Sequence, residues 1–182
     1  MRVNSHLRWW VNFAAMQAGW FACVLAAAHG GVRLAPIAAL LVIALHLALS
    51  HERRGELQVA AVTLLIGAAW ESIVISTGWL HYNDDGAIVP WWIFAMWPMF
   101  STTLNISMRF LHGRPWLAVA LGAIGAPLSY AAGARLGALT LPHRTAALVL
   151  QGAGWALILP TLMWLSLRLS PEWRLQEPTM RR

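Results

Sequence analysis

The sequence predicts an all-α membrane protein, a single domain of six transmembrane helices with both termini in the cytoplasm. The first observation behind this prediction is composition. Hydrophobic residues make up 59% of the 182 residues, charged residues only 11%, and the mean hydropathy is +0.58. A soluble domain carries about 25% charged residues, so lipid must replace water around most of this surface. The other two observations are the apolar runs and the positions of the arginines.

Six apolar stretches are each long enough to cross the hydrocarbon core of a bilayer, which takes about 17 to 25 helical residues. They cover residues 9–28, 33–50, 57–76, 90–111, 115–133 and 145–167. The connections between them, in order, contain "HGG" (29–31), "HERRGE" (51–56), "HYNDDG" (81–86), "LHGRP" (111–115) and "LPHR" (141–144). Gly, Asn, Asp and Pro in these connections end or begin helices. Pro90 and Pro115 occupy expected first-turn positions, where a missing N–H costs nothing.

The first stretch has a second interpretation, as a cleaved signal peptide. Arg2 and Arg8 precede it, and "AAA" at 26–28 resembles a cleavage site. However, the run is longer than the roughly 7 to 15 apolar residues of a signal peptide. It also carries Asn12 and Gln17. We therefore expect the stretch to be retained, since cleavage would leave five spans and put the two termini on opposite sides.

The arginines predict the orientation. All 13 basic residues are Arg, and the threading puts ten of them on one side of the membrane and three on the other. The ten are Arg2, Arg8, Arg53, Arg54, Arg109, Arg114, Arg168, Arg174, Arg181 and Arg182, and the three are Arg33, Arg135 and Arg144. Basic residues accumulate on the cytoplasmic side. We therefore expect cytoplasmic termini in a bacterial inner membrane, with the "HYNDDG" loop facing outward.

Several classes of function have no support in the sequence. The arginines lie at the ends of apolar runs and form no single stripe, which argues against nucleic-acid binding. The chain has no P-loop, no dinucleotide-binding glycine motif, no HExxH and no nucleophile elbow, so we expect no cofactor. His29, His81 and His143 belong to three different loops and lack the spacing of a helix-borne metal site, so no metal is expected either.

Glu71 is the candidate catalytic residue. It lies inside the apolar run "AAWESIVIST" (68–77), about five residues or roughly 7–8 Å from the expected outer end of its span. An ionisable group within a span usually faces the bundle interior or a wet cavity and is often functional. In a dry site we expect a neutral acid that donates a hydrogen bond or a proton. Alternatively, Glu71 only joins helices by bonding Gln151 or Tyr130.

The tryptophans divide into two groups. Eight of the 12 lie where a membrane-interface belt would be: Trp9, Trp10, Trp116, Trp164 and Trp173 on the inner side, and Trp79, Trp91 and Trp92 on the outer. Trp20, Trp70, Trp97 and Trp155 lie deeper, at the depth of Glu71. The candidate ligand-binding residues at this depth are Trp20, Trp70, Trp97, Tyr130, Gln151 and Gln17. They predict a small aromatic-walled chamber with few polar groups, or else simple helix packing. In the inner half, we expect Asn12 to bond Asn105.

Four motifs carry a resemblance to a known family. They are Asn12-x4-Gln17-x2-Trp20, the Trp70-Glu71-Ser72 triplet with Gly78-Trp79 after it, "PWWIFAMWPMF" with the following Ser-Thr, and "GAPLSYAAG" (125–133). Together they resemble a family of small bacterial polytopic inner-membrane proteins classed only as a domain of unknown function. The resemblance covers nearly the whole chain. It implies a multi-pass topology and no particular activity.

A fainter likeness is to membrane carotenoid enzymes of the lycopene-cyclase type. The residues that carry it are Glu71, Gly78, Trp79, Tyr82, Pro90 and Trp97. A second acidic residue, which such a cyclase would use, is not evident inside any span. The likeness implies only that an isoprenoid-like apolar ligand is chemically reasonable.

Three functions are compatible with these features. The first is a protein that binds or modifies a lipid or isoprenoid-like small molecule in an outer-half chamber around Glu71. The second is a structural or accessory membrane subunit without catalysis, in which the polar groups only pack helices. The third is a small transporter working as a homodimer, although six spans are few for a transport path and no broken helix is evident. The expected partners are membrane lipid and an apolar small molecule.

Overall fold

The computed structural model describes residues 5–50, 52–83 and 89–170. Over these residues the chain forms six α-helices: α1 (Ser5–Ala28), α2 (Ala35–Leu49), α3 (Arg53–Ser76), α4 (Trp91–Ser101), α5 (Pro115–Arg135) and α6 (Arg144–Leu169). It also forms a 3-10 turn, η1 (Arg109–Leu111), and two short strands, β1 (His81–Tyr82) and β2 (Leu139–Thr140). Arg2, Trp173, Arg174, Arg181, Arg182 and the Asp-Asp-Gly of the predicted outward loop lie outside the described residues.

Four helices are long and apolar enough to cross a membrane: His6–Ala28, Arg53–Ser76, Pro115–Arg135 and Arg144–Leu169. Their outer surfaces are apolar, as at Leu65, Ile124 and Leu157, which are 69%, 62% and 72% exposed. Large apolar patches of this kind mark contact with lipid or a partner. The protein is therefore a helical membrane protein, as its composition predicts. The remaining α2 and α4 have 15 and 11 residues, about 22 and 16 Å, and alone are shorter than the roughly 30 Å core.

The predicted fourth helix, residues 90–111, is wrong beyond Ser101. The chain continues there in tight turns over 102–108 and then in η1. The hydroxyl groups of Ser101, Thr102 and Thr103 each donate to the carbonyl three residues back, at 2.7 Å. Such side chains offer the backbone an alternative to helical hydrogen bonds, and Pro98 already removes one of those bonds. Residues 101–105 are buried, so protein shields the irregular backbone from lipid.

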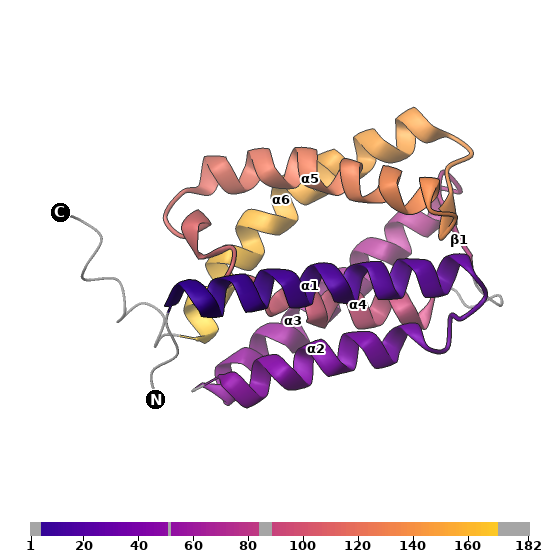
Figure 1. Ribbon diagram of the computed structural model, residues 1–182. Helices are drawn as coiled ribbons and strands as arrows, with labels where there is room; N and C mark the ends of the chain where they lie inside the picture. Colours follow the sequence, from indigo (N-terminus) through magenta and orange to yellow (C-terminus); the bar gives the residue numbers. More distant parts are fainter. Residues whose placement is uncertain (1–4, 51, 84–88, 171–182) are drawn as a thin grey trace.

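The helices run along one common axis, with α1 between α5 on one side and α2 on the other (Figure 1). Helix α1 packs against α2 and α4, α3 packs against α4 and α6, and α5 packs against α6. Glycines bring α5 and α6 together, because a Cβ on Gly122 would lie only 2.1 Å from the Trp155 carbonyl oxygen. Contacts between α1 and α5 are sparse by comparison. Helix α1 begins and α6 ends at the same end of the bundle (Figure 1).

The two short strands join the α3–α4 connection to the α5–α6 connection. They pair antiparallel, with His81 opposite Thr140 and Tyr82 opposite Leu139. Gly78 ends α3 with φ +67° and Gly137 follows α5 with φ +90°. Both values lie in the left-handed region that glycine adopts without strain. The pairing holds Tyr82 beyond the C-terminal end of α3, within reach of Glu71.

Candidate functional site

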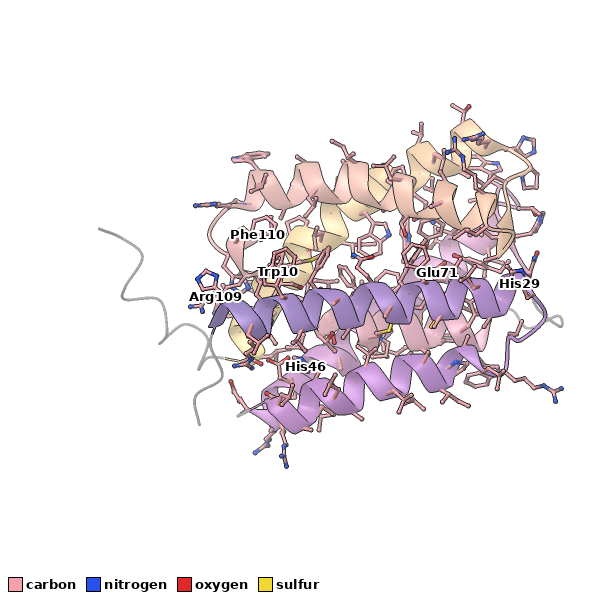
Figure 2. All side chains as sticks on the ribbon, viewed as in Figure 1. Trp10, His29, His46, Glu71, Arg109 and Phe110 are labelled. Atoms are coloured by element: carbon pink, nitrogen blue, oxygen red, sulfur yellow. The ribbon has the colours of Figure 1, made fainter. Side chains whose placement is uncertain are left out.

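Glu71 is buried within the bundle and its carboxyl group accepts three hydrogen bonds. The side chain is 1% exposed. Tyr82 donates to Oε2 at 2.6 Å, and Tyr130 and Trp97 donate to Oε1 at 2.7 and 3.3 Å. The donors come from β1, α5 and α4, so one acid joins four elements far apart in the sequence. Figure 2 shows Glu71 between the helices, toward the end of the bundle that carries His29.

The tyrosines are neutral hydrogen-bond donors in this arrangement. The Tyr82 and Tyr130 hydroxyls lie 3.4 Å apart. Tyr82 sits outside the helices, and burial, followed by the adjacent Glu71 and Tyr130, raises its pKa well above the ordinary value of 10.0. Trp92 meets the Tyr82 ring edge-on at 5.6 Å. The packing of Trp92 on the Tyr82 ring and the β1–β2 pairing together hold the Tyr82 hydroxyl against the Glu71 carboxyl group.

A cavity of about 650 Å³ reaches Glu71 from the side of α1 and α5. Its aromatic lining consists of Trp9, Phe13, Trp20, Tyr82, Trp92, Trp97, Phe100, Phe110, Tyr130 and Trp155. Along α1 the lining extends from Trp9 to Val24, which is about 22 Å of helix. The cavity is therefore elongated and mostly apolar. It extends well beyond the outer-half chamber that the sequence predicts, to Ser107 and Phe110 at the opposite end.

The predicted ligand-binding residues divide between two places. Glu71, Gln17, Trp20, Trp97 and Tyr130 line the cavity. Trp70 and Gln151 are not among its lining residues.

Trp70 and Gln151 instead bond each other in the contact between α3 and α6. The Trp70 indole donates to Gln151 Oε1 at 3.0 Å. The ring lies against Gly154, where a Cβ would come within 2.0 Å of it. The Trp70 ring is closely packed and its N–H has a partner, so this side chain connects α3 to α6. In the structure Trp70 thus packs between α3 and α6 and does not line the cavity.

Several of the aromatic residues that line the cavity were not among the predicted ligand-binding residues, and two of these, Tyr82 and Trp92, lie at the Glu71 end. Tyr82 lies in a connection between helices, and only the strand pairing brings it to Glu71. Trp92 was assigned to the outer interface belt, but it is 1% exposed and lines the cavity. Its position directly after Pro90 and Trp91 gives no signal of this, because Trp91 in the same turn is 73% exposed.

A second buried polar cluster lies toward the other end of the bundle, where His46 is seen in Figure 2. His46 Nε2 and Glu56 Oε2 are hydrogen-bonded at 3.0 Å, and Asn105 donates to Glu56 Oε1 at 3.1 Å. Glu56 is 3% exposed. Glu56 belongs to the predicted connection "HERRGE", but in the structure it lies in the first turn of α3. This cluster joins α2 and α3 to the turns at 102–108.

The predicted bond between Asn12 and Asn105 is wrong. Asn12 donates to the Thr102 carbonyl at 3.0 Å and accepts from the Ser107 hydroxyl at 2.7 Å. It thereby satisfies backbone and side chain in the interrupted segment, while Asn105 turns toward Glu56. In the part of the chain that the structure describes, no group of three or more His, Cys, Asp or Glu side chains could hold a metal ion.

Comparison with known protein families assigns the chain to one of them. Residues 9–161 match a family described as "Protein of unknown function (DUF2878)". The chain belongs to the DUF2878 family. The match extends from the first turns of α1 into the second half of α6, so it includes Glu71, its three donors and all the cavity-lining residues. This is the kind of family that the sequence motifs resembled. No curated protein and no solved structure matches the chain, and the likeness to lycopene-cyclase-type enzymes finds no support.

Proposed function

We propose that this DUF2878 protein binds an apolar, chain-like molecule, a membrane lipid or isoprenoid, with its polar end at Glu71. The observation that carries the proposal is the cavity itself, with about 650 Å³ of apolar space. Small-molecule sites occupy about 300–1,000 Å³ and combine apolar walls with a few convergent polar groups. The cavity follows α1 for about 22 Å, a large part of the roughly 30 Å bilayer core. An elongated molecule fits this shape better than a compact one.

The hydrogen bonds at Glu71 favour binding over proton transfer. Three donors are turned onto its two oxygens, so the acid is an acceptor in this arrangement. A general acid would instead need its own proton directed at the reacting atom. We therefore propose that Glu71 orients a ligand, and that Gln17, Trp20, Trp97 and Tyr130 contact it.

The position of the cavity supports entry from the membrane. Both α1 and α5 contribute to the wall, and contacts between these two helices are sparse. Six described arginines lie at the end where α1 begins and three at the other end: Arg8, Arg53, Arg54, Arg109, Arg114 and Arg168 against Arg33, Arg135 and Arg144. This supports a bacterial inner-membrane location with the first group in the cytoplasm. Glu71 would then bind the ligand in the outer half.

A matched pair of variants tests the proposal. Gly125 lines the cavity, and a Cβ there would meet nothing within 4 Å. Gly125→Phe should fill the cavity without disturbing the helix contacts. Ile124→Phe adds a ring at the neighbouring residue, which is 62% exposed on the outer surface. We expect mass spectrometry of detergent-purified protein to find a co-purifying chain-like lipid in the wild type and in Ile124→Phe, and little in Gly125→Phe. Equal lipid content in the two variants would contradict the proposal.

One observation favours a second candidate, a small transporter. The fourth segment is interrupted at 102–108, and Thr103, Ser107 and Met108 of this interruption line the cavity. Interrupted helices at a central site are typical of secondary transporters. Reconstituted vesicles should then take up the co-purified molecule only when an ion gradient is applied. Uptake equal to that of protein-free vesicles would contradict the transporter and leave binding as the function. An accessory subunit should give the same results with and without Gly125→Phe in both assays.

A further inference from the structure

The hydrogen bonds around Glu71 leave one position of its carboxyl group open. Each carboxylate oxygen accepts about two hydrogen bonds. Oε1 already accepts from Tyr130 and Trp97, whereas Oε2 accepts from Tyr82. Oε2 therefore has room for one further donor, and Glu71 belongs to the cavity wall.

The cavity also offers hydrogen-bond donors. The indole nitrogens of Trp92 and Trp155 are buried and have no hydrogen-bond partner among the described residues. Both tryptophans line the cavity, and Trp92 is 1% exposed. A buried N–H without a partner costs free energy, but both nitrogens are covered, so an acceptor on a ligand reaches one only when the ring turns toward the cavity. The open position on Glu71 Oε2 thus calls for a ligand that donates, and the indoles favour one that can also accept.

A hydroxyl group meets both requirements. It has one donor and two acceptor positions, whereas an ether oxygen and a carboxylate only accept. A carboxylate or phosphate would in addition bring negative charge, with no donor, to an acidic side chain in an apolar site. We propose that the cavity selects an apolar chain ending in a hydroxyl group, an alcohol, over the ether and the acid of the same chain. This inference rests on the proposed function and gives the chemical class of its ligand.

Competition binding to the purified protein tests this selectivity. Tritiated hexadecanol is the labelled probe, and unlabelled hexadecanol, its methyl ether and palmitate are the competitors. A hydrogen bond to an acidic group lost with the ether should weaken competition about tenfold or more. We expect palmitate to compete at least as poorly as the ether. Trp116→Phe is the control, because Trp116 is 83% exposed and lies outside the cavity lining.

The outcomes separate the inference from the proposed function. If the three chains compete equally, the cavity binds apolar chains but the inferred selectivity is wrong. If the ether or palmitate competes better than the alcohol, the inference is also wrong. If the protein binds none of the three chains, the proposed function itself fails. Only a clear preference for the alcohol supports both.

Variants at the acid assign the selectivity to Glu71. Glu71→Gln keeps the shape and replaces the acidic acceptor by a weaker amide, so we expect the alcohol to lose most of its advantage over the ether. Tyr82→Phe removes the donor now on Oε2 and frees a second acceptor position there. This variant should keep or increase the advantage, and it serves as the test if the Gln variant does not fold. Loss of the advantage in Tyr82→Phe would overturn the assignment.

Discussion

A single methyl group at Gly67 should destabilise the protein, because Trp97 occupies the space above this glycine. A Cβ on Gly67 would lie 2.1 Å from Trp97 Cδ2 and 2.3 Å from Cγ. These atoms belong to the part of the indole nearest the Trp97 backbone. The residue is 4% exposed, and its ring stacks on that of Trp155 with the two ring centroids 5.1 Å apart. The ring cannot swing away without losing that stacking and its bond to Glu71. Gly67→Ala must therefore displace either the indole or α3.

The magnitude follows from three contributions. Overpacking a core position costs about 1–3 kcal/mol. Loss of the Trp97–Glu71 hydrogen bond adds roughly 1 kcal/mol. Replacing glycine by alanine within a helix returns about 1 kcal/mol. We therefore expect a net loss of about 2 kcal/mol, or a fall in Tm of roughly 4–8 °C for a domain of this size.

The assay is thermal unfolding in detergent, with Gly125→Ala as the control. Gly125 is also helical, but its Cβ would meet nothing within 4 Å. The same chemical change should there stabilise the protein by about 0.5–1 kcal/mol. If both variants raise Tm equally, the packing of the Trp97 ring against Gly67 is contradicted, and with it the hydrogen bond from Trp97 to Glu71.

Three further predictions concern other parts of the bundle. Glu56→Ala removes the buried carboxyl group that His46 Nε2 and the Asn105 amide both contact and should lower the free energy of unfolding by about 3 kcal/mol, because two buried polar groups lose a hydrogen-bond partner; a loss below about 1 kcal/mol in detergent unfolding would contradict the burial of this cluster. In Tyr130→Phe, the sole remaining tyrosine is Tyr82. Because the pKa of Tyr82 is raised in the folded protein, the unfolded state loses this proton at a lower pH. Phenolate absorbance should therefore stay low in the folded protein just above pH 10, and the free energy of unfolding should fall as the pH rises further. Ionisation of Tyr82 with an ordinary pKa would contradict its burial. Cys23 is 0% exposed and should react with a maleimide only after unfolding, so rapid labelling of the folded protein would disprove the packing of α1.

The sequence predicts helices well where length and composition decide them. The α1, α2, α3, α5 and α6 helices lie close to the predicted spans because an apolar run of that length has few alternatives in lipid. The fourth span is different. Its apolar run reads as continuous, but Pro98 and the three hydroxyl-bearing residues at 101–103 compete locally with the helix. The strength of that competition depends on Asn12 and on the burial of the segment, neither of which is visible in the local sequence.

The site is predicted in part for a similar reason. Depth along a helix can be counted, so Glu71 and Tyr130 were expected at one level and they do bond each other. Rotation about the helix axis cannot be counted in the same way. Trp70 and Trp97 have similar depth, yet one points to α6 and the other to the acid. Tyr82 depends on a strand pairing across 57 positions, from Tyr82 to Leu139, for which a two-residue strand gives almost no signal.

The ribbon of β1 and β2 links the buried Glu71 to exposed residues at one end of the bundle. His81 and Thr140 are exposed, while Tyr82, the next residue of β1, donates a hydrogen bond to Glu71. A molecule that binds this exposed ribbon and moves β1 would therefore change the hydrogen bonding of the buried Glu71 carboxyl group. Conversely, a ligand in the cavity that displaces the Tyr82 hydroxyl would shift β1 and, through the strand pairing, β2.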